Sequence, residues 1–480
     1  MPSVCTTRCA PAAAPRDVSA VTILLLIAGA VVFSAAASAH AILWKRDVRA
    51  ATAWAGFIWF VPYAGAALYW LFGVNRIRRE AALLRATARR KRGRCEPPTI
   101  PTSPFGRVGD RLAGTPLTPD NEVEIYATGE AAFDSMRKAI EAAEHSLALS
   151  MYIFKRDATG RDVIEALLRA AARGVEVRVL IDAVGSRATG RSISGQLNAG
   201  GAVAALFLPA RLPGVRSLNL RNHRKLLIVD GRHAYTGGMN IADGYASSSA
   251  AEPIRDTQFG LRGPVVRDLA ETFAVDWQFT TGESLEGHLW FPRPEAAGPM
   301  TARVLADGPD ESMELGRWVI LGAISAARRH IRIVTPYFLP DITMIAALSI
   351  AALRGVSVHI YIPEVLDHRV VKWASDAQLW QVLEKGCRVW FTPPPFDHSK
   401  IFTVDGAWSF VGSSNWDTRS MRLNFELNVE VHDPNFTTTL DALIDARRDT
   451  AREITLEMID ARPGLIRFRD SLARLLSPYL

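Results

Sequence analysis

The chain contains an internal repeat, and this repeat restricts the fold more than any other feature of the sequence. Residues 139–154 (AIEAAEHSLALSMYIF) and 323–338 (AISAARRHIRIVTPYF) each join the end of a helix to an apolar strand. Downstream, residues 170–182 and 350–363 each join an Ala/Leu-rich helix, a glycine suited to a C-cap, and a Val/Ile-rich strand. Such alternation favours an α/β sandwich with a mostly buried sheet. We therefore expect two tandem α/β sandwich halves with mixed sheets, related by a pseudo-twofold axis.

A chemically richer repeat lies inside this one. HRKLLIVDGRHAYTGGMN begins at His223, HSKIFTVDGAWSFVGSSN begins at His398, and both follow the pattern H-x-K-x4-D-x6-G-[GS]-x-N. A single H-x-K is a weak signal, because a basic pair on an exposed strand would explain it equally well. Two complete copies with identical offsets, at equivalent points of a structural repeat, favour a functional site.

The spacing within each copy predicts where its side chains point. Residues i and i+2 face the same side of a strand, so each His and its Lys are expected to share one space. Asp-Gly is a turn signal, so Asp230 and Asp405 should lie where the chain reverses. The returning strand then brings Asn240 or Asn415 back beside the His. If the halves meet about a twofold axis, one pocket holds two His, two Lys and two Asn.

Such a pocket suits a phosphodiester. Ammonium and carboxamide groups can hold the nonbridging oxygens and stabilise developing charge. One neutral imidazole can attack phosphorus, and the other, protonated, can donate to the leaving alkoxide. This chemistry needs no metal or other cofactor, and we expect none. The four cysteines form no C-x-x-C pair, which argues against a disulfide framework or a zinc site.

Two apolar segments precede the repeat. Residues 20–44 and 50–74 contain no Asp, Glu, Lys or Arg, and each is long enough to cross about 30 Å of hydrocarbon as a helix. They predict a two-helix transmembrane hairpin. The alternative is a signal peptide cleaved near residues 37–39, although the second segment would still anchor the product.

The segment that follows is strongly basic. Residues 75–95 carry nine Lys and Arg against one acidic residue, which predicts that this side of the membrane is cytoplasmic. Direct binding of lipid headgroups or nucleic acid is the alternative interpretation. The expected organisation is an N-terminal tail (1–19), two transmembrane helices (20–74), a basic segment and Pro-rich linker (75–121), half 1 (122–290), a junction (291–300) and half 2 (301–480).

The paired motif resembles the phospholipase D superfamily in its two-copy, single-chain form, over about residues 122–480. The stretches MYIFKRDATGRDV, DAVGSR, NHRKLLIVDG, GGMNIADGY and VGSSNWDTRSMRLNFELN, the paired apolar segments and the tail ARLLSPYL are closer still to bacterial cardiolipin synthases. This resemblance implies a multi-pass protein of the bacterial inner membrane with a cytoplasmic catalytic domain. It also implies transfer of a phosphatidyl group between two phosphatidylglycerol molecules, giving cardiolipin and glycerol through a phosphohistidine.

Other activities remain open at this point. A membrane-bound hydrolase of the same superfamily would use the same residues, and so would a transphosphatidylase with another alcohol acceptor such as phosphatidylethanolamine. The apolar segments disfavour a nuclease, so the expected partners are phosphatidylglycerol, other anionic phospholipids and the membrane, without nucleic acid. A non-catalytic lipid-binding scaffold is disfavoured because both motif copies are complete.

The resemblance also assigns roles to residues. It makes His223 the residue that forms the phosphohistidine and His398 the acid/base, an order that two such similar copies do not themselves provide. Its phosphate-binding positions match Lys225, Lys400, Asn240 and Asn415, and its motif aspartates Asp230 and Asp405, although part of the catalytic signature, look structural.

Carboxylates outside the motif are expected to orient the histidines. Glu426, in LNFELN, matches the position that would serve His398, and Asp256, in IRDTQF, is the candidate for His223. The second copy offers Ser413 to the phosphate where the first has a glycine, so the pocket is expected to be asymmetric. Tyr152 and Tyr337 end equivalent strands, and their sequence context leaves a place in the pocket or in the core open.

Overall fold

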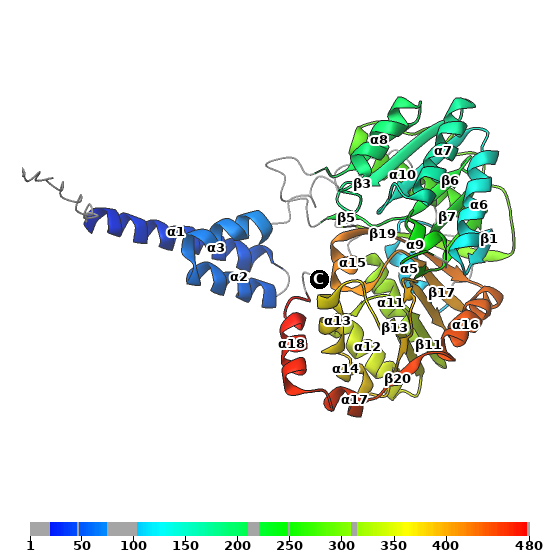
Figure 1. The fold of residues 1–480 in the computed structure, drawn as a ribbon. Helices are drawn as coiled ribbons and strands as arrows, with labels where there is room; N and C mark the ends of the chain where they lie inside the picture. The colour runs from blue at the N-terminus through cyan, green and yellow to red at the C-terminus, as the bar shows by residue number, and fades with distance from the viewer. Residues whose placement is uncertain are drawn as a thin grey trace, which may run out of the picture. The chain divides into compact units, whose positions relative to one another are not determined.

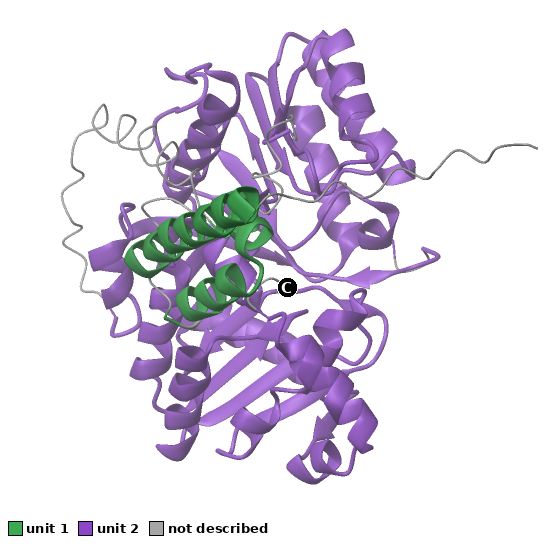
Figure 2. Cartoon of the chain, turned by 90° about the vertical axis from the view of Figure 1, so that its left-hand side faces the viewer, with its two compact units in different colours: residues 1–76 green, residues 77–480 purple. Residues whose placement is uncertain are grey.

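The computed structural model describes residues 20–45, 48–73, 103–209, 220–247, 250–308 and 314–477. The chain divides into two compact units, residues 1–76 and 77–480 (Figure 2). The predicted basic run at 75–95 and the last three residues of the tail motif lie outside the described residues.

The N-terminal unit begins with one long apolar helix, α1 (Ala20–Trp44). Among the described residues, α1 is the one helix that is long and apolar enough to cross a membrane, judged by length and composition. The alternative cleavage site at residues 37–39 lies inside this continuous helix. The sequence prediction of a long apolar helix is therefore confirmed for the first of the two segments.

The second apolar segment does not form one helix. It contains α2 (Val48–Phe60), α3 (Pro62–Leu68) and the π-helical turn η1 (Tyr69–Gly73). Pro62 causes the break, because proline lacks a backbone N–H and disfavours helical geometry in the residue before it; Val61 accordingly has φ −133° and ψ 77°. A 13-residue helix such as α2 reaches roughly 20 Å, which is short of a bilayer core. The predicted two-helix hairpin is thus not confirmed.

Unit 2 is built on a long hydrogen-bonded path of strands. Its order is β20-β14-β13-β11-β16-β17-β19-β10-β1-β9-β7-β6-β2-β3-β4 (Figure 1). Half 1 contributes β1 (Thr118–Tyr126), β2 (Ser146–Met151), β3 (Glu176–Asp182), β4 (Val203–Phe207), β6 (Leu226–Val229), β7 (His233–Gly237) and β9 (Gln258–Arg262). Half 2 contributes β10 (Met300–Asp307), β11 (His330–Val334), β13 (Ser357–Pro363), β14 (Arg388–Thr392), β16 (Ile401–Val404), β17 (Trp408–Gly412), β19 (Asn424–His432) and β20 (Arg452–Ile454).

This order has an internal symmetry about the antiparallel pair of β1 and β10. Reading outward, the strands run 1-9-7-6-2-3-4 on one side and 10-19-17-16-11-13-14 on the other, where β20 is added at the edge. Within each half, β2–β3–β4 and β11–β13–β14 are parallel, whereas the motif strands β6 and β16 pair antiparallel with their neighbours. The predicted fold class, two mixed-sheet α/β halves about a pseudo-twofold, is confirmed.

Helices cover both faces of this sheet. The residues of β3 alternate between two cores: Val177, Val179 and Ile181 pack in one, while Leu180 packs in the other. The first core is covered by α6 (Gly129–Ala142), α7 (Ala158–Ala172) and α8 (Gly190–Ala199); the second lies under α10 (Val265–Thr281) and α16 (Pro434–Arg448) and draws on both halves. Half 2 repeats the first layer with α11 (Leu315–Ala326) and α12 (Ile342–Leu353).

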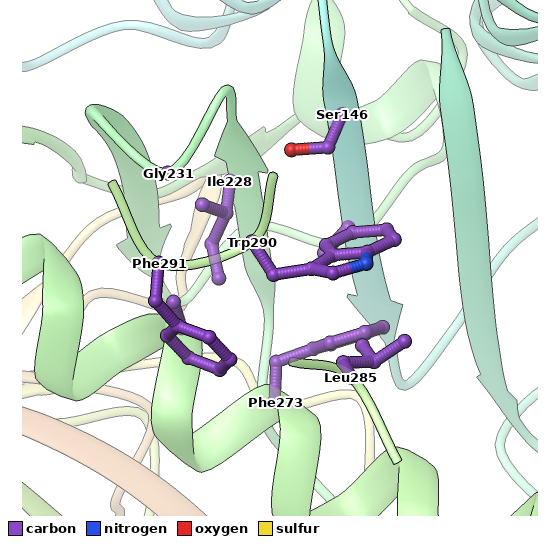
Figure 3. Close-up of a pocket in the computed structure, with 9 residues that line it drawn as sticks. Ser146, Ile228, Gly231, Phe273, Leu285, Trp290 and Phe291 are labelled. Atoms are coloured by element: carbon purple, nitrogen blue, oxygen red, sulfur yellow. The ribbon is translucent and has the colours of Figure 1, made fainter. Parts of the chain in front are cut away.

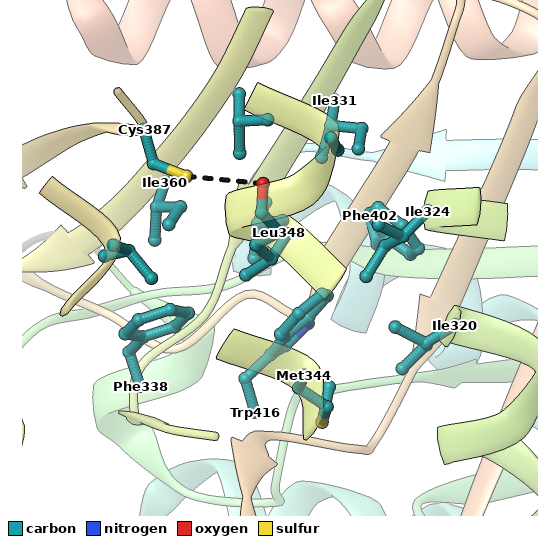
Figure 4. Packing of buried hydrophobic residues seen from close by; sticks show 14 of the residues in the cluster. Ile320, Ile324, Ile331, Phe338, Met344, Leu348, Ile360, Cys387, Phe402 and Trp416 are labelled. Carbon is teal, nitrogen blue, oxygen red and sulfur yellow. Dashed lines mark hydrogen bonds between the residues drawn. The ribbon is translucent and has the colours of Figure 1, made fainter. Parts of the chain in front are cut away.

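The α11/α12 layer contains the one cysteine within the described residues. Figure 4 shows Cys387 packed among Leu348, Ile360 and neighbouring side chains, with its Sγ–H donating to the Leu348 carbonyl at 3.7 Å. Burial raises the pKa of this thiol to about 12. A neutral, enclosed thiol of this kind is a core residue rather than a nucleophile.

Two segments outside the repeats also belong to unit 2. Residues 107–112, inside the expected linker, form α5 (Arg107–Leu112), and Asp110 there pairs with the buried Arg303 at 2.8 Å. Near the junction, Trp290 and Phe291 pack beside Phe273 around an apolar void of about 10 Å³ (Figure 3). This void is too small for a substrate, so the functional site must lie elsewhere.

Shorter elements complete the unit. They are β5 (Arg221–Asn222), α9 (Asp243–Ala246), β8 (Ile254–Arg255), β12 (Phe338–Leu339), α13 (Arg369–Asp376), α14 (Trp380–Leu383), β15 (Phe396–Asp397), β18 (Trp416–Asp417), α15 (Thr418–Arg422), α17 (Leu456–Asp460) and α18 (Gly464–Arg474).

Candidate active site

Two short strands bring the motif histidines to the boundary between the halves. Strand β5, just before His223, pairs in parallel with the start of β19, and the backbone N–H of His223 donates to the carbonyl of Phe425 at 2.9 Å. Strand β15, just before His398, pairs with β8, and the backbone N–H of His398 donates to the carbonyl of Arg255 at 2.7 Å. Each histidine therefore follows a short strand that pairs with a strand of the other half.

This exchange decides which carboxylate holds which imidazole. Nδ1 of His223 lies 2.9 Å from Oε2 of Glu426, and Nδ1 of His398 lies 2.9 Å from Oδ2 of Asp256. The predicted pairing, Glu426 with His398 and Asp256 with His223, is wrong. The prediction took each carboxylate from the same half as its histidine. In the structure, β5 of half 1 pairs with β19 of half 2, and β8 of half 1 pairs with β15 of half 2. Because Nδ1 is occupied, Nε2 of each ring is the atom left to react.

The motif lysines are buried beside the histidines. Nζ of Lys225 donates to the carbonyl of His223 at 2.7 Å, and Nζ of Lys400 donates to the carbonyl of His398. Burial, together with the charge of the other lysine, lowers the pKa of Lys225 to about 7. Burial likewise lowers the pKa of Lys400 to about 8. Two cations that repel one another in a buried space form a site that favours an anion.

The two motif asparagines are used differently. Asn240 accepts from the backbone N–H of Ile153 at 3.1 Å and donates to the Tyr245 hydroxyl at 2.9 Å. Asn415 is also buried, but its Oδ1 has no hydrogen-bond partner among the described residues. Equal offsets in the sequence therefore do not give equal roles, since the amide of Asn240 already holds the end of β2.

The structure does not bring the motif aspartates to the histidines. Asp230 and Asp405 lie at the far ends of β6 and β16, in the left-handed region with φ 51° and 54°. Asp230 accepts from the backbone N–H groups of residues 144, 145 and 146 at 2.7–3.0 Å. Asp405 does the same for residues 328, 329 and 330 at 2.7–2.9 Å. Each tethers the start of a neighbouring strand, so their inclusion among the catalytic residues is corrected to a structural role.

Glu426 is surrounded by donors. In addition to His223, it accepts from Oγ of Ser413 at 2.5 Å and from Nδ2 of Asn424 at 3.0 Å. Burial opposes ionisation of this carboxyl, but the His223 imidazole, Lys225 and the Ser413 hydroxyl together hold its pKa below the usual value. Ser413 thus contacts the carboxylate that holds His223, where direct contact with the phosphate was expected.

Asp256 accepts fewer side-chain hydrogen bonds than Glu426. Besides His398, it accepts from the backbone N–H of Thr257 at 2.7 Å, and burial raises its pKa to about 7. Gly238 occupies the position equivalent to Ser413, and a Cβ there would lie 2.4 Å from Oδ2 of Asp256. The expected difference between Ser413 and Gly238 is therefore present, and it changes the hydrogen bonding of the two carboxylates, Glu426 and Asp256.

Burial biases both imidazoles toward their neutral forms. Burial lowers the pKa of His223 to about 4, with a further contribution from Lys225 that Glu426 opposes. Burial and both lysines depress the pKa of His398 well below its ordinary value. A bound phosphate would add negative charge and raise both pKa values.

Aromatic rings flank both histidines. The Tyr152 ring lies 4.7 Å from the His223 ring and 5.1 Å from Nζ of Lys225, and the Tyr337 ring lies 6.5 Å from the His398 ring. The structure thus places both tyrosines at the site. Sequence reasoning missed Tyr245, whose hydroxyl oxygen lies 3.4 Å from Nδ1 of His398. Its position five residues after Asn240, in GGMNIADGY, was the available signal.

Comparisons with known proteins agree with this architecture. A family model described as "Cardiolipin synthase, PLD-like domain" matches residues 136–254 and 320–448, one segment in each half. A second model, described as "Phospholipase_D-nuclease N-terminal", matches residues 32–73.

Similar proteins extend over nearly the whole chain. Cardiolipin synthase A of Pseudomonas aeruginosa (strain LESB58) is 35% identical over 482 residues, which cover 97% of this chain and 98% of the relative. The major cardiolipin synthase ClsA of Bacillus subtilis (strain 168) is 33% identical over 459 residues, covering 91% and 95%. Among solved structures, phosphatidylserine synthase of Haemophilus influenzae Rd KW20 has a TM-score of 0.61 at 14% identity, covering 79% of this chain and 100% of that one, a similarity of fold. The family model, repeated in both halves, and these full-length relatives show that the chain belongs to the cardiolipin synthase family of phospholipase D-like proteins.

Proposed function

We propose that the protein is a cardiolipin synthase that transfers a phosphatidyl group from one phosphatidylglycerol to another. The observation that carries this proposal is the pair of histidines, each held at Nδ1 by a buried carboxylate of the opposite half, with a buried lysine bonded to the backbone carbonyl of each. The family and its full-length relatives support the choice of substrate.

In the first step, Nε2 of His223 attacks phosphorus of the donor lipid. The new P–N bond forms as the bond from phosphorus to the glycerol headgroup oxygen breaks, and protonated His398 gives its proton to that oxygen. Lys225 and Lys400 hold the nonbridging oxygens and stabilise the charge that develops on them. The product is free glycerol and phosphatidyl-His223.

In the second step, the primary hydroxyl of a second phosphatidylglycerol is the nucleophile. Neutral His398 accepts its proton, the hydroxyl oxygen bonds to phosphorus, and the P–N bond to His223 breaks. Cardiolipin leaves, and both histidines return to their starting protonation states. Water in place of the second lipid would give phosphatidic acid instead.

The order of the histidines follows from their carboxylates. Glu426 accepts three side-chain hydrogen bonds and stays ionised, so it can stabilise the positive charge that develops on His223 during attack. Asp256 has a raised pKa and shares a proton with His398, which suits an acid/base. This electrostatic difference supports His223 as the nucleophile.

The proposed setting is the bacterial inner membrane, in a multi-pass arrangement with the catalytic unit cytoplasmic. The apolar helix α1, the match of residues 32–73 and the basic run at 75–95 support this arrangement. Labelling single cysteines at positions 46 and 110 with an impermeant reagent in intact cells and in inverted vesicles tests it. Labelling of position 110 from outside intact cells would contradict it.

The direct test of function is product analysis. Purified full-length protein is incubated with phosphatidylglycerol in mixed micelles, and the lipids and glycerol are quantified. Cardiolipin and glycerol should appear in equal amounts. His223→Ala should form neither, and His398→Ala should form no cardiolipin and at most one glycerol per enzyme molecule. Phosphatidic acid without cardiolipin would identify a hydrolase, and a mixed product in the presence of phosphatidylethanolamine would identify a broader transphosphatidylase.

A further inference from the structure

Helix α18 presents its apolar side to solvent. Leu465 is 86% exposed, Phe468 68% and Leu472 55%, and Leu475 and Leu476 just beyond the helix are 71% and 50% exposed. Spacings of three and four residues place these side chains on one face of the helix. We call these five residues the α18 stripe. A contiguous apolar surface of this kind is uncommon on a soluble protein and marks a contact surface.

The opposite face of α18 is polar where it meets the protein. Asp470 is 1% exposed and accepts from Nη1 of Arg462 at 2.9 Å and from Nη2 of Arg469 at 2.6 Å. A helix that buries an ion-paired carboxylate and exposes leucines is held in that orientation by specific contacts. The outward direction of the α18 stripe therefore belongs to the fold.

Contacts with α13 fix the same orientation. Ala473 packs with Ala374 and Leu339, and the guanidinium of Arg469 lies 4.3 Å from the centre of the Trp373 ring. Figure 1 shows α18 lying along α13 at one side of half 2. The helix is thus a built part of unit 2, with the α18 stripe as its free surface.

The charge on this helix indicates what covers the stripe. α18 contains Arg467, Arg469 and Arg474, and its one acidic residue, Asp470, is buried and paired. An apolar stripe on a helix with excess arginine fits the interface of an anionic bilayer, where acyl chains receive the leucines and phosphate headgroups receive the guanidinium groups. A second copy of the same surface would bring arginines together, which disfavours self-association.

We propose that α18 inserts its apolar stripe into the surface of an anionic membrane and thereby holds the catalytic unit against the lipid. This proposal rests on the proposed function only where it names the lipid that is turned over. Membrane binding by α18 is argued from the helix alone.

The connection to the active site runs through α13. Asp367, two residues before α13, accepts from the Tyr337 hydroxyl at 2.6 Å, and the Tyr337 ring faces His398. Val365 and Val370, on either side of this contact, are 59% and 38% exposed. A membrane seated on α18 would therefore lie next to the side of the pocket that His398 lines, where the acceptor lipid must arrive.

Depth measurements test the proposal. The full-length protein, with its native cysteines replaced, carries one fluorophore at Phe468→Cys or at Leu112→Cys on α5, which is 52% exposed and lies outside the stripe. It is reconstituted into vesicles of phosphatidylglycerol and phosphatidylcholine containing brominated acyl chains. The bromines should quench the label at position 468 several times more strongly than the label at 112. Equal quenching at the two positions would overturn the proposal, as would self-quenching at 468 that grows with protein density, which indicates a second copy.

Activity measurements separate membrane seating from chemistry. The variant Leu465→Ser/Phe468→Ser/Leu472→Ser should form cardiolipin about tenfold more slowly from phosphatidylglycerol vesicles, because three interfacial side chains are lost. Its turnover of a short-chain, monomeric phosphatidylglycerol should be unchanged. The matched control is Leu112→Ser on α5, whose side chain is 52% exposed, and it should change neither rate.

The outcomes distinguish the two proposals. An equal loss on both substrates, or no loss on vesicles, overturns the membrane role of α18. Failure of the wild-type protein to form cardiolipin from either substrate overturns the proposed function, while the quenching result still decides the membrane role.

Discussion

The two histidine sites of this enzyme are alike in motif and different in electrostatics. His223 and His398 each lie 2.9 Å from a buried carboxylate of the other half. Glu426 also receives hydrogen bonds from Ser413 and Asn424, whereas Gly238 and Ile254 occupy the equivalent positions around Asp256 and offer no side-chain donor. The comparison teaches that the positions shared by both motif copies place the reactive groups. Positions that differ between the copies, inside the motif and beyond it, set the electrostatic environment of each histidine.

The largest expected effect comes from removing the histidines themselves. His223→Ala should abolish phosphatidyl transfer, by about 10⁴-fold or more, because no covalent intermediate can form. His398→Ala should also lose overall turnover but still form some phosphatidyl-enzyme. Reactions quenched in cold denaturant at neutral pH, which preserves the P–N bond, and analysed by mass spectrometry should show modified His223 in the second variant. A modified His398 in the first would reverse the assignment of roles.

Removing the charge of Glu426 should lower kcat more than removing the charge of Asp256. Glu426→Gln should lower kcat by about 10²–10³-fold, because the positive charge on His223 loses its ionised partner. Asp256→Asn should lower it by about tenfold, because Asp256 is closer to its neutral form already. Steady-state kinetics with purified variants measures both. Equal losses would remove the proposed difference between the two sites.

The buried lysines permit a stability test of the same comparison. Because both pKa values are lowered in the folded state, protonation destabilises the fold fully below the folded pKa, and this penalty vanishes as the pH rises to about 10.5. Lys225→Met should therefore stabilise the protein at pH 6.5, by on the order of a few kcal/mol, and much less at pH 10. Lys400→Met should gain less, since its pKa is lowered less. Thermal melts at the two pH values check this, and a gain that does not depend on pH would contradict it.

The smallest expected effect concerns a single hydroxyl. Ser413→Ala removes one donor to Glu426 and should lower kcat by about three- to tenfold, in line with about 1 kcal/mol for one hydrogen bond. Ser414→Ala, at the next position but bonded to Asn428, is the matched control. Similar losses in both variants would mean that Ser413 acts through packing alone.

Much of this architecture could be predicted from the sequence. The repeat predicted the two halves, because periodicity and strand composition are local properties. The D-G pair likewise predicted the turns at Asp230 and Asp405. The second apolar segment was predicted as one helix because it is long and carries no charge. Its Pro62 was present in the sequence, but the helix break that it causes was not predicted.

The rest depends on contacts that no local pattern encodes. The exchange of carboxylates follows from the two-residue strands β5 and β8, which are too short to leave a periodic signal. The orientation of α18 depends on the contacts of Asp470 with two arginines. An amphipathic pattern alone would predict that the apolar side of the helix is buried. Repeat symmetry predicts which residues are equivalent, and contacts between halves decide which of them meet.

The crossed pairing of histidines and carboxylates also has a consequence for heredity. A gene for one half encodes a histidine without the carboxylate that holds it, so one half acting as a monomer would lack a complete site. A substitution at position 426 changes selection at position 223, although they are encoded about 200 codons apart. Recombination that exchanges one half between diverged relatives should therefore yield inactive chimaeras more often than exchange of both halves together.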